Sequence, residues 1–285
     1  MPDTIRAQLG AAAQRLADAG VPDPVVDAEL LLGHVLGRSR GEVQAAVVRG
    51  DALSAEERSA FDALVRRRAE RVPLQHLTGS AAFRHVQLQV GPGVFVPRPE
   101  TEIVVQFAID ALLGSAEPAP IGIDLGTGSG AIALAMATEV PHARVFAVEL
   151  SPDAHAWAAR NTAGVENLTL VLGDLATAFD DLAGTAAVVI SNPPYVPDEA
   201  VPRDPEVRLF DPAQALYGGP DGLDVVRVIS RRAQRLLHPG GLLVLEHGEL
   251  QGDAIRAVLA ADGWRAPATH QDLTRRDRAT TALRP

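Results

Sequence analysis

A glycine-rich turn at Gly126–Gly130 constrains the fold of this chain more than any other segment. The apolar run Ile121–Leu125 has the length of a buried strand, and it leads directly into this turn and then into a helical run, Ala131–Ala137. Glycine permits a sharp turn and lets the backbone amides approach a ligand with no Cβ in the way. The pattern predicts a doubly wound α/β sheet that binds a ligand at the carboxyl end of this strand.

Short β-rich runs alternate with helical runs from residue 97 onward, which predicts a mostly parallel seven-stranded sheet covered on both faces. We expect strands at Ile121–Leu125, Arg144–Glu149, Leu168–Leu172, Ala187–Ser191, Gly241–Glu246, and near Trp264 and Ala279. Between them we expect helices at Ala131–Ala137, Pro152–Asn161, Leu223–Leu237 and Gly252–Ala261.

The region before the sheet has a different pattern. Residues 1–78 carry helical periodicity, and one helix is expected to begin at Ser54, because Glu57 stands at the capping-box spacing. Residues 79–96 predict a β-hairpin linker, which leaves residues 97–285 for the sheet domain. The run Arg66–Arg68 is interpreted as a solvated helix face.

Composition and charge exclude several classes of function. The formal net charge of −10 disfavours binding to DNA phosphates, and no basic stripe interleaved with aromatics offsets it. The chain contains no cysteine, so disulfides and thiolate metal sites are excluded, and the histidines show no paired spacing for a metal. No run is long enough for a membrane helix, and the first residues do not resemble a signal peptide, so we expect a cytoplasmic protein without membrane contact.

The second expected strand ends in an acidic residue, Glu149, about 20 residues beyond the glycine turn. An acid at this place accepts hydrogen bonds from both ribose hydroxyls, so the pair of signals indicates an adenosine-type ligand. Gly126, Gly128 and Ala131 also satisfy the dinucleotide fingerprint. The turn and the acid alone therefore leave NAD and S-adenosylmethionine both open.

The fourth expected strand delivers Asn192-Pro193-Pro194-Tyr195 to the same edge of the sheet. Two prolines fix φ and remove two amide donors, which stiffens the loop. An amide or nucleobase nitrogen is a poor nucleophile that needs orientation, and the Asn192 side-chain oxygen and Pro193 carbonyl could accept its two hydrogens while Tyr195 covers the planar group. A surface turn is the alternative reading of these residue types.

Several segments carry a resemblance to known methyltransferases. The run Asp124–Gly130 resembles the first motif of class I methyltransferases, and Gly173-Asp174 resembles their adenine-contacting turn. With Val96–Glu102, Leu245–Gly248 and Gln251-Gly252, the chain resembles the release factor glutamine methyltransferase family, also known as PrmC or HemK, over nearly its whole length.

The resemblance implies a class I, Rossmann-like fold and N5-methylation of the glutamine in the Gly-Gly-Gln motif of peptide chain release factors, with S-adenosylmethionine as donor and no metal. It implies that residues 1–78 help to dock the release factor. It assigns catalysis to Asn192, Pro193 and Tyr195, and substrate binding to these together with Pro194. It assigns cofactor binding to Gly126, Thr127, Gly128, Ser129, Gly130, Glu149, Asp174, Leu175 and Asn192.

The sequence departs from the family pattern at two places and leaves alternatives open. Leu175 stands where an aromatic residue often follows Asp174, and Glu149 where Asp is common. The rival functions are a ribosomal-protein glutamine methyltransferase, a DNA adenine-N6 methyltransferase, an NAD dehydrogenase and a non-catalytic adenosine-ligand sensor. Arg98, Glu100 and Glu102 suggest either acid–base chemistry or ion pairs that hold the linker, and we favour ion pairs.

Overall fold

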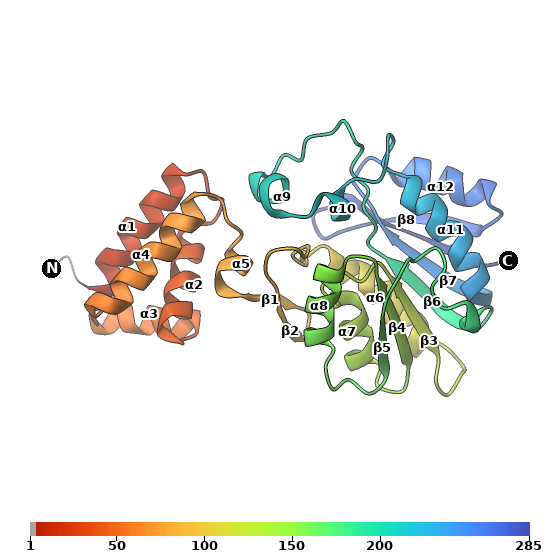
Figure 1. Ribbon diagram of the computed structural model, residues 1–285, viewed down its shortest axis with the longest axis horizontal. Coiled ribbons are helices and arrows are strands. Elements are labelled where there is room, and N and C mark those ends of the chain that lie inside the picture. Colours follow the sequence, from red (N-terminus) through yellow and green to blue (C-terminus); the bar gives the residue numbers. More distant parts are fainter. Residues whose placement is uncertain (1–3) are drawn as a thin grey trace. The chain divides into compact units, whose positions relative to one another are not determined.

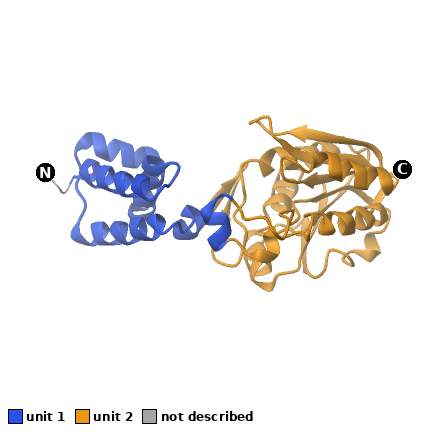
Figure 2. Ribbon diagram, turned by 90° about the horizontal axis from the view of Figure 1, so that it is seen from above, with its two compact units in different colours: residues 1–80, 203–210 blue, residues 81–202, 211–285 orange. Residues whose placement is uncertain are grey.

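The computed structural model describes residues 4–285 and divides into two units (Figures 1 and 2). One unit comprises the residues up to Ser80 together with Arg203–Phe210, and the other comprises Ala81–Pro202 and Asp211–Pro285. The first unit therefore contains a segment that lies far along the chain, just after the Asn-Pro-Pro-Tyr loop.

The first unit is helical. It contains α1 (Ile5–Asp18), α2 (Pro24–Leu36), α3 (Arg40–Arg49), α4 (Ala55–Ala69), α5 (Leu74–Thr78) and α9 (Pro205–Phe210). The capping box expected at Ser54 and Glu57 is confirmed at the start of α4. A second capping box, at Ser39 and Glu42, begins α3, which the periodicity analysis did not predict. Leu16, Leu31 and Phe61 are among the buried side chains of this unit.

One arginine contradicts the expected solvated face on α4. Arg66 and Arg67 are exposed, but Arg68 is buried. Its Nε donates to Asp27 Oδ2 at 2.7 Å, and its Nη1 donates to Glu206 Oε1 at 2.7 Å. The interpretation was wrong for Arg68 because the buried carboxylates that neutralise it lie 41 and 138 residues away along the chain.

Glu206 on α9 is the centre of this ion cluster. Arg71 also donates to it, through Nε at 2.8 Å and through Nη2. Burial alone would raise the pKa of Glu206. Hydrogen bonds with Arg71, Asp204 and Arg68 outweigh this effect and lower the pKa to about 2. The carboxylate therefore stays ionised at neutral pH and fixes α9 within the helical unit.

The second unit contains a hairpin and a seven-stranded sheet with its helices. The hairpin is β1 (Ser80–Phe83) and β2 (Val86–Gln89). The sheet strands are β3 (Ile121–Leu125), β4 (Arg144–Glu149), β5 (Leu168–Leu172), β6 (Ala186–Ser191), β7 (Leu237–Glu246), β8 (Arg265–Gln271) and β9 (Asp277–Leu283). The helices are α6 (Thr101–Leu113), α7 (Ala131–Glu139), α8 (Pro152–Asn161), the short η1 (Asp180–Leu182), α10 (Ala213–Leu216), α11 (Asp224–Leu236) and α12 (Gly252–Ala261).

The strand order is β5-β4-β3-β6-β7-β9-β8, and only the pairs that involve β9 are antiparallel. This confirms the predicted mostly parallel seven-stranded sheet. From β3 the chain winds outward through β4 to β5, then returns to β6 on the other side of β3. The direction of winding thus changes between β3 and β6, which is where sheets of this kind bind ligands.

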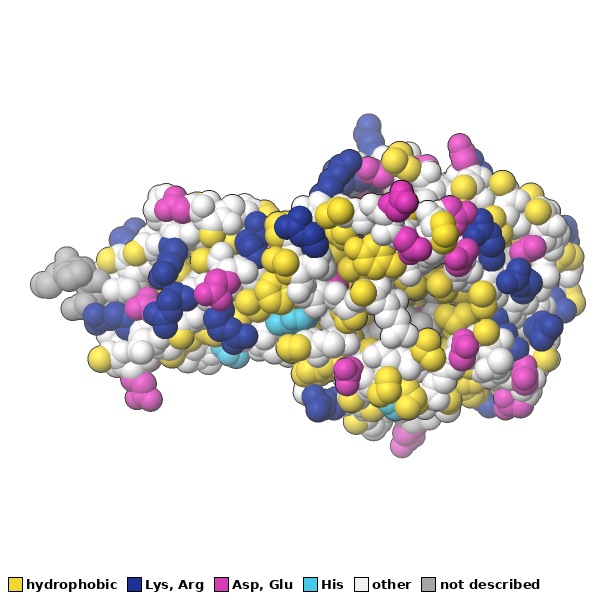
Figure 3. All heavy atoms as spheres, turned by 45° about the horizontal axis from the view of Figure 1, so that its top comes forward, with side chains coloured by type: hydrophobic (Ala, Val, Ile, Leu, Met, Phe, Trp, Pro, Cys, Tyr) yellow, Lys and Arg dark blue, Asp and Glu magenta, His cyan; other side chains and the backbone are white. Residues whose placement is uncertain are grey.

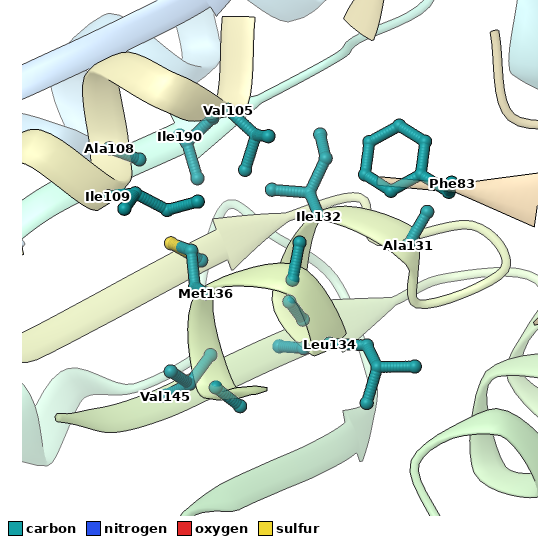
Figure 4. Close-up of a cluster of buried hydrophobic side chains, with 14 of the residues drawn as sticks. Phe83, Val105, Ala108, Ile109, Ala131, Ile132, Leu134, Met136, Val145 and Ile190 are labelled. Atoms are coloured by element: carbon teal, nitrogen blue, oxygen red, sulfur yellow. The ribbon is translucent and has the colours of Figure 1, made fainter. Parts of the chain in front are cut away.

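Two apolar layers cover the faces of the sheet. On one face α6, α7 and α8 pack against alternate strand residues such as Val145 and Ile190, and Figure 4 shows part of this cluster around Met136. On the other face α11 and α12 pack against Ile123 and Leu243. Helix α6 was not among the predicted helices. Burial on both faces holds the central strands rigidly and so fixes the loops at their ends.

The surface mixes charges of both signs. On the face shown in Figure 3, arginine side chains are interspersed with acidic ones on both units. Among the helices within residues 4–285, none has the length and apolar character needed to cross a membrane.

The buried ion cluster generates a stability prediction. Replacing Arg68 leaves two carboxylates without this partner, so we expect Arg68→Met to lower the free energy of unfolding of the helical unit by ~3 kcal/mol. Denaturation followed by amide hydrogen exchange in α4 measures this loss. The exposed neighbour provides the control, and Arg67→Met is expected to change stability by no more than about 0.5 kcal/mol. Equal losses in the two variants would contradict the cluster's role.

Candidate functional site

The glycine turn leaves β3 at the carboxyl end of the strand. Gly126, Gly128 and Gly130 have φ values of +80°, +58° and +86°, a region that other residues rarely adopt. A Cβ added to Gly126 or Gly128 would meet no atom within 4 Å. The turn therefore presents bare backbone to open space, which is the surface that a nucleoside or amino-acid group needs for close approach.

The two hydroxyl residues of the turn point inward. Thr127 is 7% exposed and Ser129 3% exposed. Thr127 Oγ1 donates to the buried Asp124 Oδ2 at 2.6 Å, and the Ser129 carbonyl accepts a hydrogen bond from Asn161 at 2.9 Å. The Gly126 and Thr127 amides also donate to the Val148 carbonyl at 3.0 Å, so these contacts together anchor the turn to the protein.

Asp124 is a fully buried carboxyl group beneath the turn. Burial raises its pKa to about 7, although the hydrogen bonds with Thr127 and with the Ala133 backbone act in the opposite direction. The negative charge of Glu149 raises this pKa further. A carboxyl group with so perturbed a pKa in a ligand-binding region is typical of functional sites.

Glu149 ends β4 next to the turn. Its Oε2 accepts the Gly128 amide hydrogen at 2.8 Å, and its Oε1 accepts that of Ser151 at 2.8 Å. A carboxylate has about four acceptor positions, so two remain for other donors such as a pair of hydroxyls. The Glu149 carbonyl also accepts the Gly173 amide hydrogen at 2.9 Å, which brings the turn after β5 beside it.

The turn after β5 contains Asp174 and Leu175. Asp174 is exposed, and its Oδ1 accepts the Ala176 amide hydrogen at 2.8 Å, which closes a local turn. Leu175 is partly buried and packs against the apolar cluster that includes Leu182. Asp174 keeps its second carboxylate oxygen available for a ligand, while Leu175 offers an aliphatic surface.

The Asn-Pro-Pro-Tyr loop begins where β6 ends. Pro193 is buried, and Asn192, Pro194 and Tyr195 are partly buried. The buried Ser191 hydroxyl donates to the Leu125 carbonyl at 2.5 Å, which joins the last residue of β6 to the last residue of β3. Because β3 and β6 are parallel neighbours, the glycine turn and this loop leave the same edge of the sheet side by side (Figure 1).

Closely packed neighbours hold the loop from behind. The Gln251 side chain donates to the Tyr195 carbonyl at 2.9 Å and accepts the Gly248 amide hydrogen at 3.0 Å. A Cβ added to Gly222 would lie 2.3 Å from the Tyr195 carbonyl oxygen, and one added to Gly218 would lie 2.4 Å from the Pro194 carbonyl oxygen. Glycine is therefore required at both positions for the loop to sit where it does.

The Tyr195 hydroxyl stays neutral at physiological pH. Burial raises the pKa of Tyr195 to about 12, and the nearby carboxyl group of Glu246 raises it as well. The ring can therefore cover a planar substrate group, but its hydroxyl is a poor base at neutral pH.

Sequence reasoning missed some of the residues that build this edge. Ser191 and Gln251 were noted only as parts of a strand and a motif, and Gly218 and Gly222 were not singled out. Within the part of the chain that the structure describes, there is no group of three or more His, Asp or Glu residues placed to hold a metal ion.

Two residues just after the linker, Arg98 and Glu102, make structural contacts. Arg98 forms an ion pair with the Asp211 carboxylate at 2.8 Å, and its guanidinium lies 5.0 Å from the centre of the Phe95 ring. Glu102 Oε1 accepts the Arg84 amide hydrogen at 3.1 Å at the turn of the hairpin. These contacts support the interpretation that Arg98 and Glu102 hold the chain in place.

Comparisons with known proteins identify the family. Residues 8–79 match the PrmC N-terminal domain, and residues 92–222 match the methyltransferase small domain. The chain is 49% identical to a release factor glutamine methyltransferase of Streptomyces coelicolor, over 97% of this chain and 96% of that protein. The chain belongs to the release factor glutamine methyltransferase family.

A second curated member of this family, from Bifidobacterium longum, is 46% identical over 96% of this chain and 98% of its own length. Among solved structures, a methyltransferase from Pyrococcus furiosus is similar with a TM-score of 0.50, at 19% identity over 69% of this chain and 87% of that chain. At this identity the likeness shows the fold alone. The family resemblance predicted from the motifs is confirmed.

The packing behind the loop generates a matched pair of variants. Gly222 and Gly263 both have positive φ, +74° and +86°, but a Cβ on Gly263 would meet nothing within 4 Å. Both alanine variants should lose about 1–2 kcal/mol of stability from backbone strain. Only Gly222→Ala also displaces the Tyr195 carbonyl, so only this variant should lower the methylation rate, by at least about tenfold. Equal rates in the two variants would show that the loop tolerates displacement.

Proposed function

We propose that this enzyme transfers the methyl group of S-adenosylmethionine to the N5 amide nitrogen of the glutamine in the Gly-Gly-Gln motif of peptide chain release factors, leaving S-adenosylhomocysteine. The observation that carries the proposal is the shared sheet edge: the glycine turn and the Asn-Pro-Pro-Tyr loop leave adjacent parallel strands, joined by the Ser191–Leu125 hydrogen bond. Donor and acceptor sites on neighbouring loops suit direct transfer between two bound molecules.

The cofactor residues fit S-adenosylmethionine. The open backbone at Gly126 and Gly128, which continues into Gly130, would border the amino-acid part, and Glu149 would accept the ribose hydroxyls with its remaining acceptor positions. Asp174 and Leu175 would border the adenine. Thr127 and Ser129 are buried and would hold the turn in shape around the cofactor.

The acceptor loop orients an amide. In our proposal the Asn192 side-chain oxygen and the Pro193 carbonyl accept the two hydrogens of the glutamine amide, while Tyr195 covers its plane and Pro194 keeps the loop stiff. These fixed acceptors increase electron density on the nitrogen and turn its reactive face toward the donor. Well-oriented reactants can recover about 7–11 kcal/mol of a barrier in this way.

The reaction needs little acid–base assistance. When bound, S-adenosylmethionine supplies an electrophilic methyl group whose bond to sulfur breaks as the bond to nitrogen forms, after which the nitrogen releases one proton to solvent. Because burial raises the pKa of Tyr195 to about 12, its hydroxyl remains protonated and does not act as a base at neutral pH. Catalysis by this chain is therefore chiefly positioning.

The helical residues 1–78 are proposed to supply part of the docking surface for the release factor, with residues 79–96 as the linker and residues 97–285 as the catalytic domain. The mixed surface charge suits a protein partner better than a nucleic acid. Because translation factors act in the cytoplasm, we propose that the enzyme is located there.

An incubation with labelled donor tests the acceptor. Purified enzyme, S-adenosylmethionine labelled in its methyl group, and either release factor, ribosomal subunits or DNA are combined in separate reactions. We expect label in the release factor, and its loss when the Gly-Gly-Gln glutamine is replaced. Label in a ribosomal protein or in DNA instead would contradict the proposed acceptor.

Loss of the amide acceptor should slow turnover. We expect Asn192→Ala to reduce kcat by about a hundredfold or more, as removal of a preorganised contact does. Calorimetry with S-adenosylmethionine should show a much smaller change in affinity. A near-normal rate would remove Asn192 from the proposed machinery.

Loss of the ribose acceptor should act on the cofactor instead. Glu149→Ala removes the acceptor and releases the Gly128 amide, so calorimetry should show S-adenosylmethionine binding weakened by at least about tenfold. The control is Glu166→Ala, because Glu166 is exposed and lies between α8 and β5. We expect this variant to bind S-adenosylmethionine with unchanged affinity. Unchanged affinity in Glu149→Ala would show that the ribose is held elsewhere.

A further inference from the structure

A buried carboxyl group with no role in the account above ends the strand beside the acceptor loop. Glu246 is the last residue of β7 and is 1% exposed. The parallel register pairs Ser191 of β6 with Leu245 of β7, so the residues that follow, Asn192 and Glu246, continue side by side. On the other side of β7, Glu246 pairs with Ala279 of β9.

The groups around the Glu246 carboxyl only partly compensate for its burial. Burial raises its pKa to about 7, while the neighbouring polar side chains of Thr101 and Asn192 and the charge of Arg278 lower it, and Glu100 raises it. Its Oε2 has no hydrogen-bond partner among residues 4–285. A buried, incompletely paired carboxyl group is costly, and such groups concentrate at functional sites.

The orientation of the Asn192 side chain depends on this neighbour. An asparagine amide has an acceptor oxygen on one side and a donor NH₂ on the other, and only the oxygen can receive an N–H from the substrate. An ionised carboxylate accepts hydrogen bonds and cannot donate one. Beside ionised Glu246, the Asn192 NH₂ group must therefore face the carboxylate, which leaves Oδ1 for the substrate.

We infer that Glu246 is a positioning residue for methyl transfer: its ionised carboxylate accepts an N–H from the Asn192 side chain and directs Asn192 Oδ1 toward the acceptor nitrogen. The inference rests on the proposed role of Asn192 and adds the residue that sets its orientation. Protonated Glu246 carries a donor that can bond Asn192 Oδ1 instead, and this removes the acceptor from the substrate.

This role makes activity depend on pH in a defined direction. Glu246 is ionised above about pH 7 and protonated below it. Tyr195, which faces it, stays neutral because its pKa is raised to about 12, and burial lowers the pKa of the adjacent His247, which keeps that ring neutral near pH 7. The other charged groups near Glu246 and Tyr195 are Arg278, Arg98 and Glu100. The rate should therefore fall as the pH drops below about 7.

Two readouts test the inference. In ¹⁵N-labelled protein, the side-chain NH₂ signals of Asn192, assigned by their absence from Asn192→Ala, should shift with a midpoint near pH 7. Single-turnover methylation of the release factor should decline below that pH, by about tenfold per unit well below the midpoint. In Glu246→Gln both pH dependences should vanish, and the rate at pH 8 should be about tenfold lower, because a neutral amide is the weaker acceptor.

The exposed Glu249 near the end of the same strand provides the matched control. Glu249→Gln should keep the wild-type titration and rate, and S-adenosylmethionine affinity should be unchanged in both variants. An Asn192 signal that does not titrate, or that titrates equally in Glu246→Gln, overturns the inference whatever the acceptor is. Absence of label in the release factor with a normal Asn192 titration overturns the proposed function alone.

A reciprocal measurement applies even if Glu246→Gln does not fold. The carboxyl ¹³C signal of Glu246 should titrate in the wild type and in Asn192→Ala. Because the Asn192 side chain lowers the Glu246 pKa, the midpoint should move to higher pH when Asn192 is removed. An unchanged midpoint would overturn the inference.

Discussion

The parallel pairing of β3 with β6 is the constraint on which the candidate site depends. Its register aligns Asp124 with Ile190, so Leu125 and Ser191 end beside each other and share a buried hydrogen bond of 2.5 Å. A slip of one residue would turn every side chain of β6 to the opposite face. The hydrophobic layers on both faces therefore fix the register and, through it, the positions of the two loops.

Electrostatics at this edge reinforce the geometry. Asp124 lies beneath the glycine turn and Glu246 beside the acceptor loop, and burial raises the pKa of each to about 7. Glu206 in the helical unit behaves differently, because its two arginine partners lower its pKa to about 2. Glu206 therefore keeps its charge and stabilises the helical unit, whereas Asp124 and Glu246 can change protonation state near neutral pH.

Much of this architecture could be predicted from local sequence. Helices α8 and α12 have the predicted bounds, because amphipathic periodicity is a local signal. Helix α3 was missed although its capping box is visible, and β7 begins at Leu237, four residues before the predicted strand. Contacts between residues far apart in the sequence could not be predicted. Neither the burial of Arg68 nor the hold of Gln251 on the Tyr195 carbonyl, 56 residues away, leaves a local pattern.

The central claim is that one sheet edge presents an amide to a methyl donor. A crystal structure of the enzyme with S-adenosylhomocysteine and a peptide containing Gly-Gly-Gln tests it most directly. The account predicts the glutamine amide nitrogen about 3 Å from both Asn192 Oδ1 and the Pro193 carbonyl oxygen, with its free face toward the sulfur. A glutamine side chain bound away from this loop, or a cofactor bound away from the glycine turn, would contradict it.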